Sequence, residues 1–331
     1  MSKIREMAVE LAKAKNYEEA TYLLEKAVSE GDIDAINDLG VIYERNNNYE
    51  KAMELYRLSG LLGSPVAIHN VGNLFETGLG VDRNDECAYL LYKRAASMNY
   101  PHAFYKIASF YYEGKVVDKD ERKAFEWVMK GAKLELKSKD ETSCLTTVGN
   151  HYEFGIYVKK NINKALKYYR LASQRGDTIA KFNSALIYLY KKGSKKSVKS
   201  GMDLLAECSK EGYPDSFAEL ALLYKEGKLV KKDFEMVDYW LTKGLKAGSP
   251  RALLVYAEMF LSGDNPNGKK NVEEGTKALA TFLKQFDGSV GGCSCRYNDI
   301  KTTFKDEIDW VDLENNPNKY LEKEAAGKCL A

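Results

Sequence analysis

The sequence predicts an all-α, right-handed superhelical solenoid of about eight antiparallel helix pairs, followed by a C-terminal helical tail. Three observations lead to this fold class. One segment with helical spacing recurs roughly every 36 residues, a second lies between its copies, and the 331 residues exceed what one compact core usually holds. A helix pair too small to bury its own apolar stripe must stack on its neighbours, which produces a solenoid.

The first recurring segment predicts the second helix of each pair, here called the B helix. It reads small-x-x-apolar-apolar-x-x-small, often with a Gly eleven residues after its start. Copies begin at Ala20, Ala52, Ala88, Ala124, Ala165, Gly201 and Val237, with a looser one near Gly275. Successive starts from Ala20 to Val237 are 32, 36, 36, 41, 36 and 36 residues apart, and the longest step places extra residues in 133–143.

The second segment predicts the first helix of each pair, the A helix. Counting its first small residue as position 0, it carries apolar or small residues at 4 and 5 and an aromatic one at 8, which share one helix face. Copies begin at Ala35, Ala67, Ala103, Cys144, Ala180, Ser216 and Ala252, after a degenerate copy over 3–14. Position 4 should be buried, as Leu39, Val71, Ile107, Val148 and Leu220.

The segment from Ala67 to Ala96, with Gly78-Leu79-Gly80-Val81 in its loop, resembles the Sel-one-like repeat (SLR) family, a tetratricopeptide-like helical solenoid. The segment from Cys144 to Gly176 resembles it too. The resemblance covers roughly 3–286, so we expect a solenoid domain over 1–286. It implies assembly or regulation of protein complexes. Residues 287–331 do not match the pattern.

The tail, residues 287–331, should form a linker and a helical cap. Its start is rich in glycine at 288–292, and 299–310 and 318–326 have the pattern of two short helices. Cys293 and Cys295 form a Cys-x-Cys pair that a metal or a redox cycle could use. Since no second pair or suitably spaced His accompanies them, we predict no metal site.

Composition and motifs argue against several functions. Lys and Arg total 50 against 48 Asp and Glu, so bulk charge does not favour nucleic-acid binding. No phosphate-binding loop, nucleophile elbow or zinc motif occurs, and we predict neither catalytic residues nor a cofactor. No apolar run is long enough to span a membrane, and the N-terminus lacks the apolar segment of a signal peptide. The expected location is therefore the cytoplasm.

The candidate binding site is the concave face, which the A helices line in tetratricopeptide-like stacks. Positions 2, 6 and 9 should face this groove. The assigned residues are Asn37, His69, Asn73, Glu76, Tyr105, Tyr112, Asn150, Glu153, Phe182, Leu186, Leu189, Leu222, Leu254 and Leu261. Asn73 and Asn150 share position 6, where an amide can donate to and accept from a peptide backbone.

The last six of these residues form an apolar strip that should not stay open to water. Four explanations remain open: the tail folds back as an autoinhibitory plug, a partner covers the strip, a second copy of the chain does so, or the A helices are rotated from the assigned phase. Deleting residues 288–331 should increase dye binding, partner binding or aggregation if the tail is the cover.

The loops between A and B helices carry a second candidate surface in the later repeats, a basic edge. Its members are Lys159, Lys160, Lys191, Lys192, Lys195, Lys196, Lys231, Lys232, Lys269 and Lys270. Such an edge could attract an acidic protein, although lysines in solvated loops are the simpler interpretation.

Taken together, the patterns favour a non-enzymatic protein–protein interaction scaffold or adaptor that binds a protein or peptide on its concave face. One alternative is a dedicated inhibitor or immunity-type protein that wraps a single toxin or enzyme. A more remote alternative is a thiol-dependent enzyme, and self-association stays open.

Overall fold

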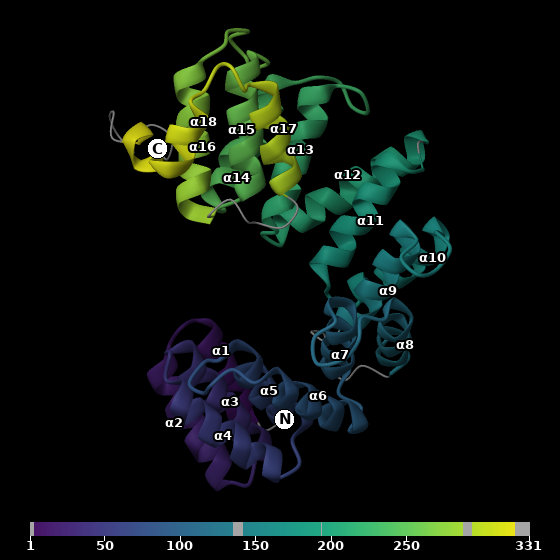
Figure 1. Ribbon diagram of the computed structural model, residues 1–331, viewed down its shortest axis with the longest axis vertical. Helices are drawn as coiled ribbons and strands as arrows, with labels where there is room; N and C mark the ends of the chain where they lie inside the picture. The colour runs from purple at the N-terminus through teal and green to yellow at the C-terminus, as the bar shows by residue number, and fades with distance from the viewer. Residues whose placement is uncertain (1–2, 135–141, 193, 287–292, 322–331) are drawn as a thin grey trace. The chain divides into compact units, whose positions relative to one another are not determined.

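The computed structural model describes residues 3–134, 142–192, 194–286 and 293–321, and all regular structure in these ranges is helical (Figure 1). The α-helices are α1 (Lys3–Lys13), α2 (Tyr17–Ser29), α3 (Ile33–Arg45), α4 (Tyr49–Leu61), α5 (Pro65–Thr77), α6 (Asp85–Ser97), α7 (Pro101–Glu113), α8 (Glu121–Gly131), α9 (Ser143–Phe154), α10 (Ile162–Ser173), α11 (Thr178–Tyr190), α12 (Lys195–Lys210), α13 (Pro214–Glu226), α14 (Phe234–Lys246), α15 (Pro250–Ser262), α16 (Val272–Phe286), α17 (Ser294–Thr303) and α18 (Trp310–Asn315). A 3-10 turn, η1 (Pro317–Tyr320), follows.

Helices α1 to α16 form the eight predicted pairs, which we number 1 to 8, with the A helices odd-numbered and the B helices even-numbered. The chain divides into two compact units, Met1–Asp177 and Thr178–Ala331. Within each unit, every B helix packs on its own A helix, and every B helix that an A helix of the same unit follows packs on that helix too. The predicted all-α repeat of helix pairs is confirmed.

Local sequence sets the ends of the helices. The first turn of α6 is capped by Asn84, whose side chain accepts a hydrogen bond from the backbone N–H of Cys87 at 2.9 Å, and Asp120 and Asn161 cap α8 and α10 in the same way. Helix α5 ends at Gly78, whose φ of 73° is the left-handed conformation in which glycine commonly terminates helices. The repeated Asn/Asp and Gly therefore fix the A–B loops.

The predicted core residues at position 4 are buried: Leu39, Val71, Ile107, Val148 and Leu220 are each at most 6% exposed. This confirms the assigned phase for the face of each A helix that packs on its B helix.

Position 5 of the A helix packs against position 4 of the B helix, and two combinations of residues occur at this contact. In pairs 2, 3 and 5 a glycine at position 5 faces a tyrosine, and a Cβ added to Gly149 would lie 2.4 Å from Tyr169 Cε1. In pairs 4, 6, 7 and 8 an alanine occupies position 5, and the B helix offers only valine or leucine, as in Ala185 with Leu205. Glycine is needed where the ring comes closest.

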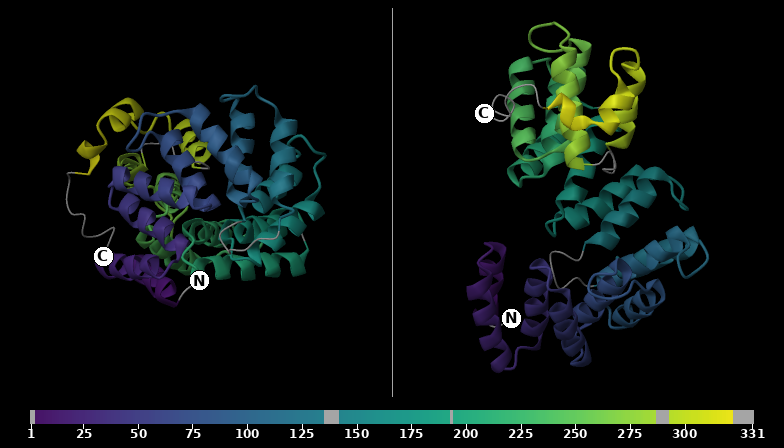
Figure 2. Two further views of the ribbon diagram at one scale, coloured as in Figure 1. Left: turned by 90° about the horizontal axis from the view of Figure 1, so that it is seen from below. Right: turned by 60° about the vertical axis from the view of Figure 1, so that its left-hand side comes forward.

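The tail packs on the last helix pair. Cys293, Tyr297, Ile300, Phe304 and Trp310 join one apolar cluster with residues of α15 and α16. Helix α17 lies beside α15, while α18 and η1 contact α16 (Figure 2). The tail thus covers the apolar face that a further repeat would otherwise cover.

The predicted helix bounds in the tail are wrong. Helix α17 begins before residue 299 and ends at Thr303, and α18 begins only at Trp310. Of the second predicted helix, 318–326, the described part is the turn η1, and 322–326 lies outside the described residues. The glycine-rich stretch 288–292 and most of the longer connection at 133–143 also lie outside them.

Candidate partner-binding surface

In pairs 2, 3, 5, 6 and 8, position 9 of the A helix does not face an open groove but points towards the B helix of the same pair. In pair 3, Glu76 at this position accepts a hydrogen bond from the phenol of Tyr92 at 2.6 Å, and in pair 2 Glu44 accepts one from Tyr56 at 2.5 Å. The same tyrosine ring lies against the glycine at position 5. The close glycine contact therefore brings the phenol within reach of the glutamate.

Asn73 at position 6 completes this network. The phenolic oxygen of Tyr92 lies 2.8 Å from the side-chain amide of Asn73 as well as 2.6 Å from Glu76. A phenol carries one hydrogen, and the charged carboxylate is the stronger acceptor. The amide atom that faces the phenol is Asn73 Oδ1, so the hydroxyl hydrogen is shared between this oxygen and the Glu76 carboxylate, both of which accept. The side-chain NH2 group of Asn73 and the second lone pair of Oδ1 are left for another ligand.

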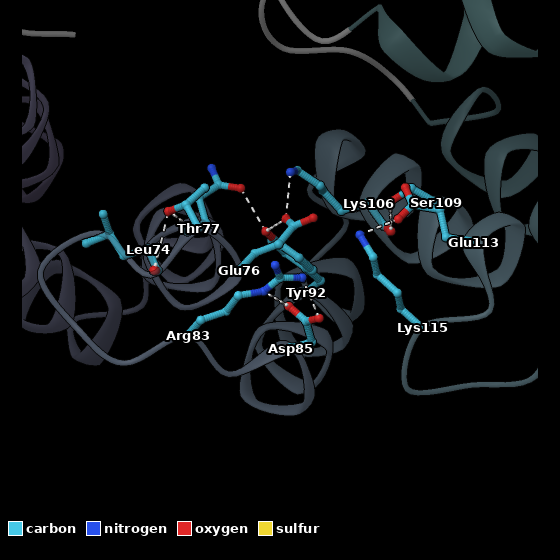
Figure 3. A network of polar contacts seen from close by, with 11 residues as sticks. Leu74, Glu76, Thr77, Arg83, Asp85, Tyr92, Lys106, Ser109, Glu113 and Lys115 are labelled. Carbon is cyan, nitrogen blue, oxygen red and sulfur yellow. Dashed lines mark hydrogen bonds and ion pairs between the residues drawn. The ribbon is translucent and has the colours of Figure 1, made fainter.

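Glu76 also connects two repeats, because Lys106 of α7 donates to the same carboxylate at 2.7 Å (Figure 3). The Lys106 ammonium lies 5.6 Å from the centre of the Tyr92 ring as well. Burial alone would raise the pKa of Glu76, but the hydrogen bonds from Lys106 and Tyr92 outweigh it and hold the pKa below its ordinary value. The carboxylate is thus ionised at neutral pH and joins α5, α6 and α7.

Pair 5 repeats the arrangement. Tyr169 of α10 lies 2.6 Å from both the Glu153 carboxylate and the Asn150 amide of α9. Asn150 Oδ1 likewise accepts from the phenol, which leaves its side-chain NH2 group and a second oxygen lone pair for another ligand. Both asparagines are half-buried. Pairs 3 and 5 of the first unit thus present two amides that tyrosine holds in a fixed orientation.

The other predicted groove residues of the first unit take different places. Asn37 is buried and accepts a hydrogen bond from Asn70 of the next A helix at 3.0 Å. His69 is buried against the rings of Tyr92, Tyr100 and His102, and its Nδ1 has no hydrogen-bond partner within the part of the chain that the structure describes.

Only Tyr105, among the first-unit aromatic residues assigned to the groove, is well exposed, at 40%. Tyr112 does not bond within its own pair but makes a short hydrogen bond to His151 Nε2 of α9. The His151 Nδ1–H donates to the carbonyl of Ile156 at 2.8 Å, which leaves Nε2 as the acceptor for the tyrosine hydroxyl.

The prediction of an apolar groove in the later repeats is wrong. Phe182, Leu189, Leu222, Leu254 and Leu261 are each at most 5% exposed, and Leu186 is half-buried. Position 9 inserts into the pair: a Cβ added to Gly201 would lie 2.6 Å from Leu189 Cγ.

Gly275 and Leu261 repeat this contact in pair 8. Because glycine replaces the usual alanine at position 0 of these B helices, the leucine side chain is accommodated inside the pair.

The tail explains only the end of the predicted strip. Leu254 and Leu261 belong to the apolar cluster that includes Tyr297 and Trp310 of the tail. Phe182 and Leu189 are instead buried among α11, α12 and α13, and Leu222 packs with α14 and α15. A plug along the whole strip is therefore excluded, since most of these side chains are covered by their own repeats.

Position 3 of the A helix, which sequence reasoning missed, carries much of the contact between neighbouring A helices. Arg5 of α1 bonds Asp38 of α3 at 2.6 Å, and in the second unit Arg251 of α15 pairs with Glu219 of α13 at 2.6 Å. Asp38 and Glu219 occupy position 3, whereas Arg251 directly precedes position 0 of its helix, so the available signal was an arginine on one A helix about one repeat away from an acidic residue at position 3 of its neighbour. These contacts fix one A helix on the next.

Two lysines of the predicted basic edge have acidic partners. Lys232 pairs with Asp264 at 2.8 Å and Lys270 with Glu307 at 2.9 Å, each in the following connection. Lys195 and Lys196 belong to the first turn of α12 rather than to a loop. All ten lysines are exposed, but these two acidic partners reduce the charge that the second unit offers.

The described residues show no grouping that suggests metal chemistry: within them no three His, Cys, Asp or Glu side chains come together as potential ligands. Cys87, Cys144, Cys208 and Cys293 are free thiols, and burial raises the pKa of Cys144 to about 12. A thiol with that pKa is a poor nucleophile at neutral pH. Among the described helices, none combines the length and apolar character needed to cross a bilayer.

Comparison with known proteins matches this chain to the Sel1 repeat over residues 12–32, 33–64, 65–100, 101–135, 147–177 and 218–249, together more than half of its length. A 63-residue segment is 38% identical to the ERAD-associated E3 ubiquitin-protein ligase component HRD3 of Candida glabrata. That segment is 19% of this chain but only 8% of the HRD3 protein.

Two solved structures share the fold. The protective antigen c5321 of uropathogenic Escherichia coli, which displays an SLR fold, matches 97% of this chain and 68% of its own with a TM-score of 0.64 and 20% identity. A Sel1 repeat protein from Oxalobacter formigenes matches 73% of this chain and 99% of its own with a TM-score of 0.59 and 25% identity.

Proposed function

Because the chain belongs to the Sel1 repeat family, whose arrays generally bind proteins, we propose that it is a non-enzymatic scaffold that binds a segment of a partner protein. The binding surface is the exposed side of α5, α7 and α9 in the first unit. It contains Asn73, Glu76, Tyr105, Lys106 and Asn150.

The pair of oriented amides is the observation that supports this proposal most directly. Tyr92 and Tyr169 donate to the side-chain oxygens of Asn73 and Asn150 at equivalent repeat positions, and each amide keeps its N–H donors and one acceptor lone pair. A peptide group offers the complementary acceptor and donor. Because hydrogen bonds fix the amides beforehand, binding costs less side-chain entropy than it would with freely rotating asparagines. The exposed Tyr105 beside them is a residue type enriched at protein interfaces.

The test compares the full chain with the Asn73→Ala/Asn150→Ala variant. Tagged proteins are used to capture partners from the cells of origin, and the main captured protein is then purified and titrated by calorimetry. We expect the double variant to bind at least about 10-fold more weakly, since two peptide hydrogen bonds of about 1 kcal/mol each are lost. The melting temperature should change little, because the tyrosine–glutamate bonds remain. Asn298→Ala, at an exposed asparagine of α17, is the control.

Equal affinity of the double variant and the wild-type chain would refute the assigned surface. The number of partners separates the two binding functions: several partners indicate an adaptor, whereas one stoichiometric partner indicates a dedicated inhibitor. Turnover of a substrate that depends on a thiol would contradict the non-enzymatic proposal.

A further inference from the structure

Two adjacent A–B loops of the first unit hold non-glycine residues in a backbone conformation that suits glycine. Val116, between α7 and α8, has φ of 62°, and Tyr157, between α9 and α10, has φ of 60°. Each is the centre of a tight turn, because the N–H of the following residue donates to the carbonyl of the preceding one at 2.6 and 2.7 Å. A three-residue turn with positive central φ is rare and strained, most of all for a β-branched valine.

The chain itself shows the unstrained solution. Helices α5, α7 and α9 each end at a left-handed glycine that begins the A–B loop. In the α5–α6 loop, the residue two places after this glycine is Gly80, with φ of 71°. Val116 and Tyr157 occupy this same place. Glycine would serve there without strain, so the valine and the tyrosine need another reason.

Burial does not supply that reason. Val116 is 46% and Tyr157 50% exposed, and the neighbouring Ile156 is 38% exposed. The Tyr157 ring contacts Phe125 of α8, with 5.8 Å between ring centres, which places the second loop against the helix that follows the first. Exposed apolar side chains held at a conformational cost are a feature of binding sites rather than of stable cores.

The charges around these residues indicate the kind of partner. Lys119, Lys159 and Lys160 are exposed in the same two loops, and none makes an ion pair within the described residues. Asp118 is the exposed, unpaired acidic residue there, whereas Asp120 caps α8 and pairs with Lys123. The loop surface is therefore apolar with an excess of positive charge.

We propose that Val116, Ile156 and Tyr157, together with Lys119, Lys159 and Lys160, form a second docking surface for an acidic segment of a partner protein that also carries apolar side chains. This loop surface consists of residues of the A–B loops, not of the A-helix positions that contain Asn73 and Asn150. It is thus independent of the proposed function and can fail separately from it.

The test uses the full chain as the target for a phage-displayed library of random 16-residue peptides. Enriched peptides are synthesised with a fluorophore and titrated by anisotropy. We expect them to combine Asp or Glu with large apolar residues. They should bind at least about 10-fold more weakly to Val116→Gly/Tyr157→Gly and to Lys159→Glu/Lys160→Glu. Leu90→Ala, at an exposed leucine of α6, should leave their affinity unchanged.

Thermal unfolding separates binding from structure. Replacing Val116 and Tyr157 by glycine relieves the strained turns, so we expect the melting temperature to stay the same or rise by about 2–4 °C. A clear fall would show that these side chains stabilise the fold and would overturn the proposal. An empty selection, peptides without carboxylates, or peptides that bind the glycine variant as well as the wild type would also overturn it. Peptides weakened only by Asn73→Ala/Asn150→Ala would overturn it while supporting the A-helix surface.

Discussion

Gly149→Ala should destabilise pair 5, although alanine normally favours a helix over glycine. The added Cβ would lie 2.4 and 2.5 Å from two atoms of the Tyr169 ring, distances that side chains do not tolerate. The ring has little freedom to move away, because its hydroxyl is bonded to Glu153 and Asn150. Alanine gains about 1 kcal/mol in helix propensity, while overpacking of a filled core costs about 1–3 kcal/mol. With two contacts this short, we expect a net loss of about 1–2 kcal/mol.

A second substitution tests the cause of this loss. Together with Gly149→Ala, the substitution Tyr169→Leu recreates the combination that Ala185 and Leu205 form in pair 6. In a Tyr169→Leu background, Gly149→Ala should be neutral or stabilising, which gives a coupling energy of about 1–3 kcal/mol. Leu205→Tyr is the reciprocal control: it should be strongly destabilising, because Ala185 carries the Cβ that the ring would meet.

The assay is urea unfolding followed by circular dichroism, with hydrogen exchange of the α9 and α10 amides to localise the effect. Hydrogen exchange matters because a repeat array can lose one pair before the others. If Gly149→Ala costs the same free energy in both backgrounds, the glycine is not required by the tyrosine ring.

Three further predictions concern titration and the tail. Burial, more than neighbouring positive charge, lowers the pKa of His69 to about 3, so only the unfolded chain takes up its proton as pH falls from 7 to 5; the free energy of unfolding should drop by about 2 kcal/mol over this range, and His69→Phe should remove that part of a pH titration. Lys106→Met should raise the pKa of Glu76, measured by NMR, and lower stability at pH 7 by about 1 kcal/mol; an unchanged pKa would contradict the assigned bridge. Arg296→Ala removes a 2.5 Å ion pair between α17 and Glu258; hydrogen exchange should quicken in α17 but not in residues 3–134, and equal exchange in α17 would mean that apolar packing alone holds the tail.

The helices and their core face were readable from the sequence because they depend on local spacing. Small residues at fixed positions and a terminal glycine recur in almost every pair, and each acts through contacts within a few residues. The burial of Val148 follows from such a pattern. The tail does not repeat, so its helix bounds had no internal copy to correct them.

The direction of the side chain at position 9 could not be predicted from the A helix alone, because it depends on the residues of the B helix. Glu76 turns to a phenol 16 residues away, and Leu189 is buried because residue 201 is a glycine. Helical spacing alone predicts the same side-chain direction for Glu76 and Leu189. A comparison between the copies would have found the signal, since tyrosine on the B helix accompanies glycine at position 5, and glycine at the start of the B helix accompanies leucine at position 9.

These two ways of packing position 9 give the two units different surfaces. In pairs 3 and 5 the glutamate and tyrosine form a polar bond that an amide at position 6 joins from the surface. In pair 2 the bond between Tyr56 and Glu44 forms with Val41 at position 6. In pairs 6 and 8 a leucine fills the same space, so no buried polar group has to be satisfied and position 6 is free to vary: it is Leu186 in one pair and Glu258 in the other. The oriented amides at this position are therefore found in the first unit, because only a phenol beneath position 6 can hold an amide in place, and the B helices of pairs 6 and 8 carry a leucine instead.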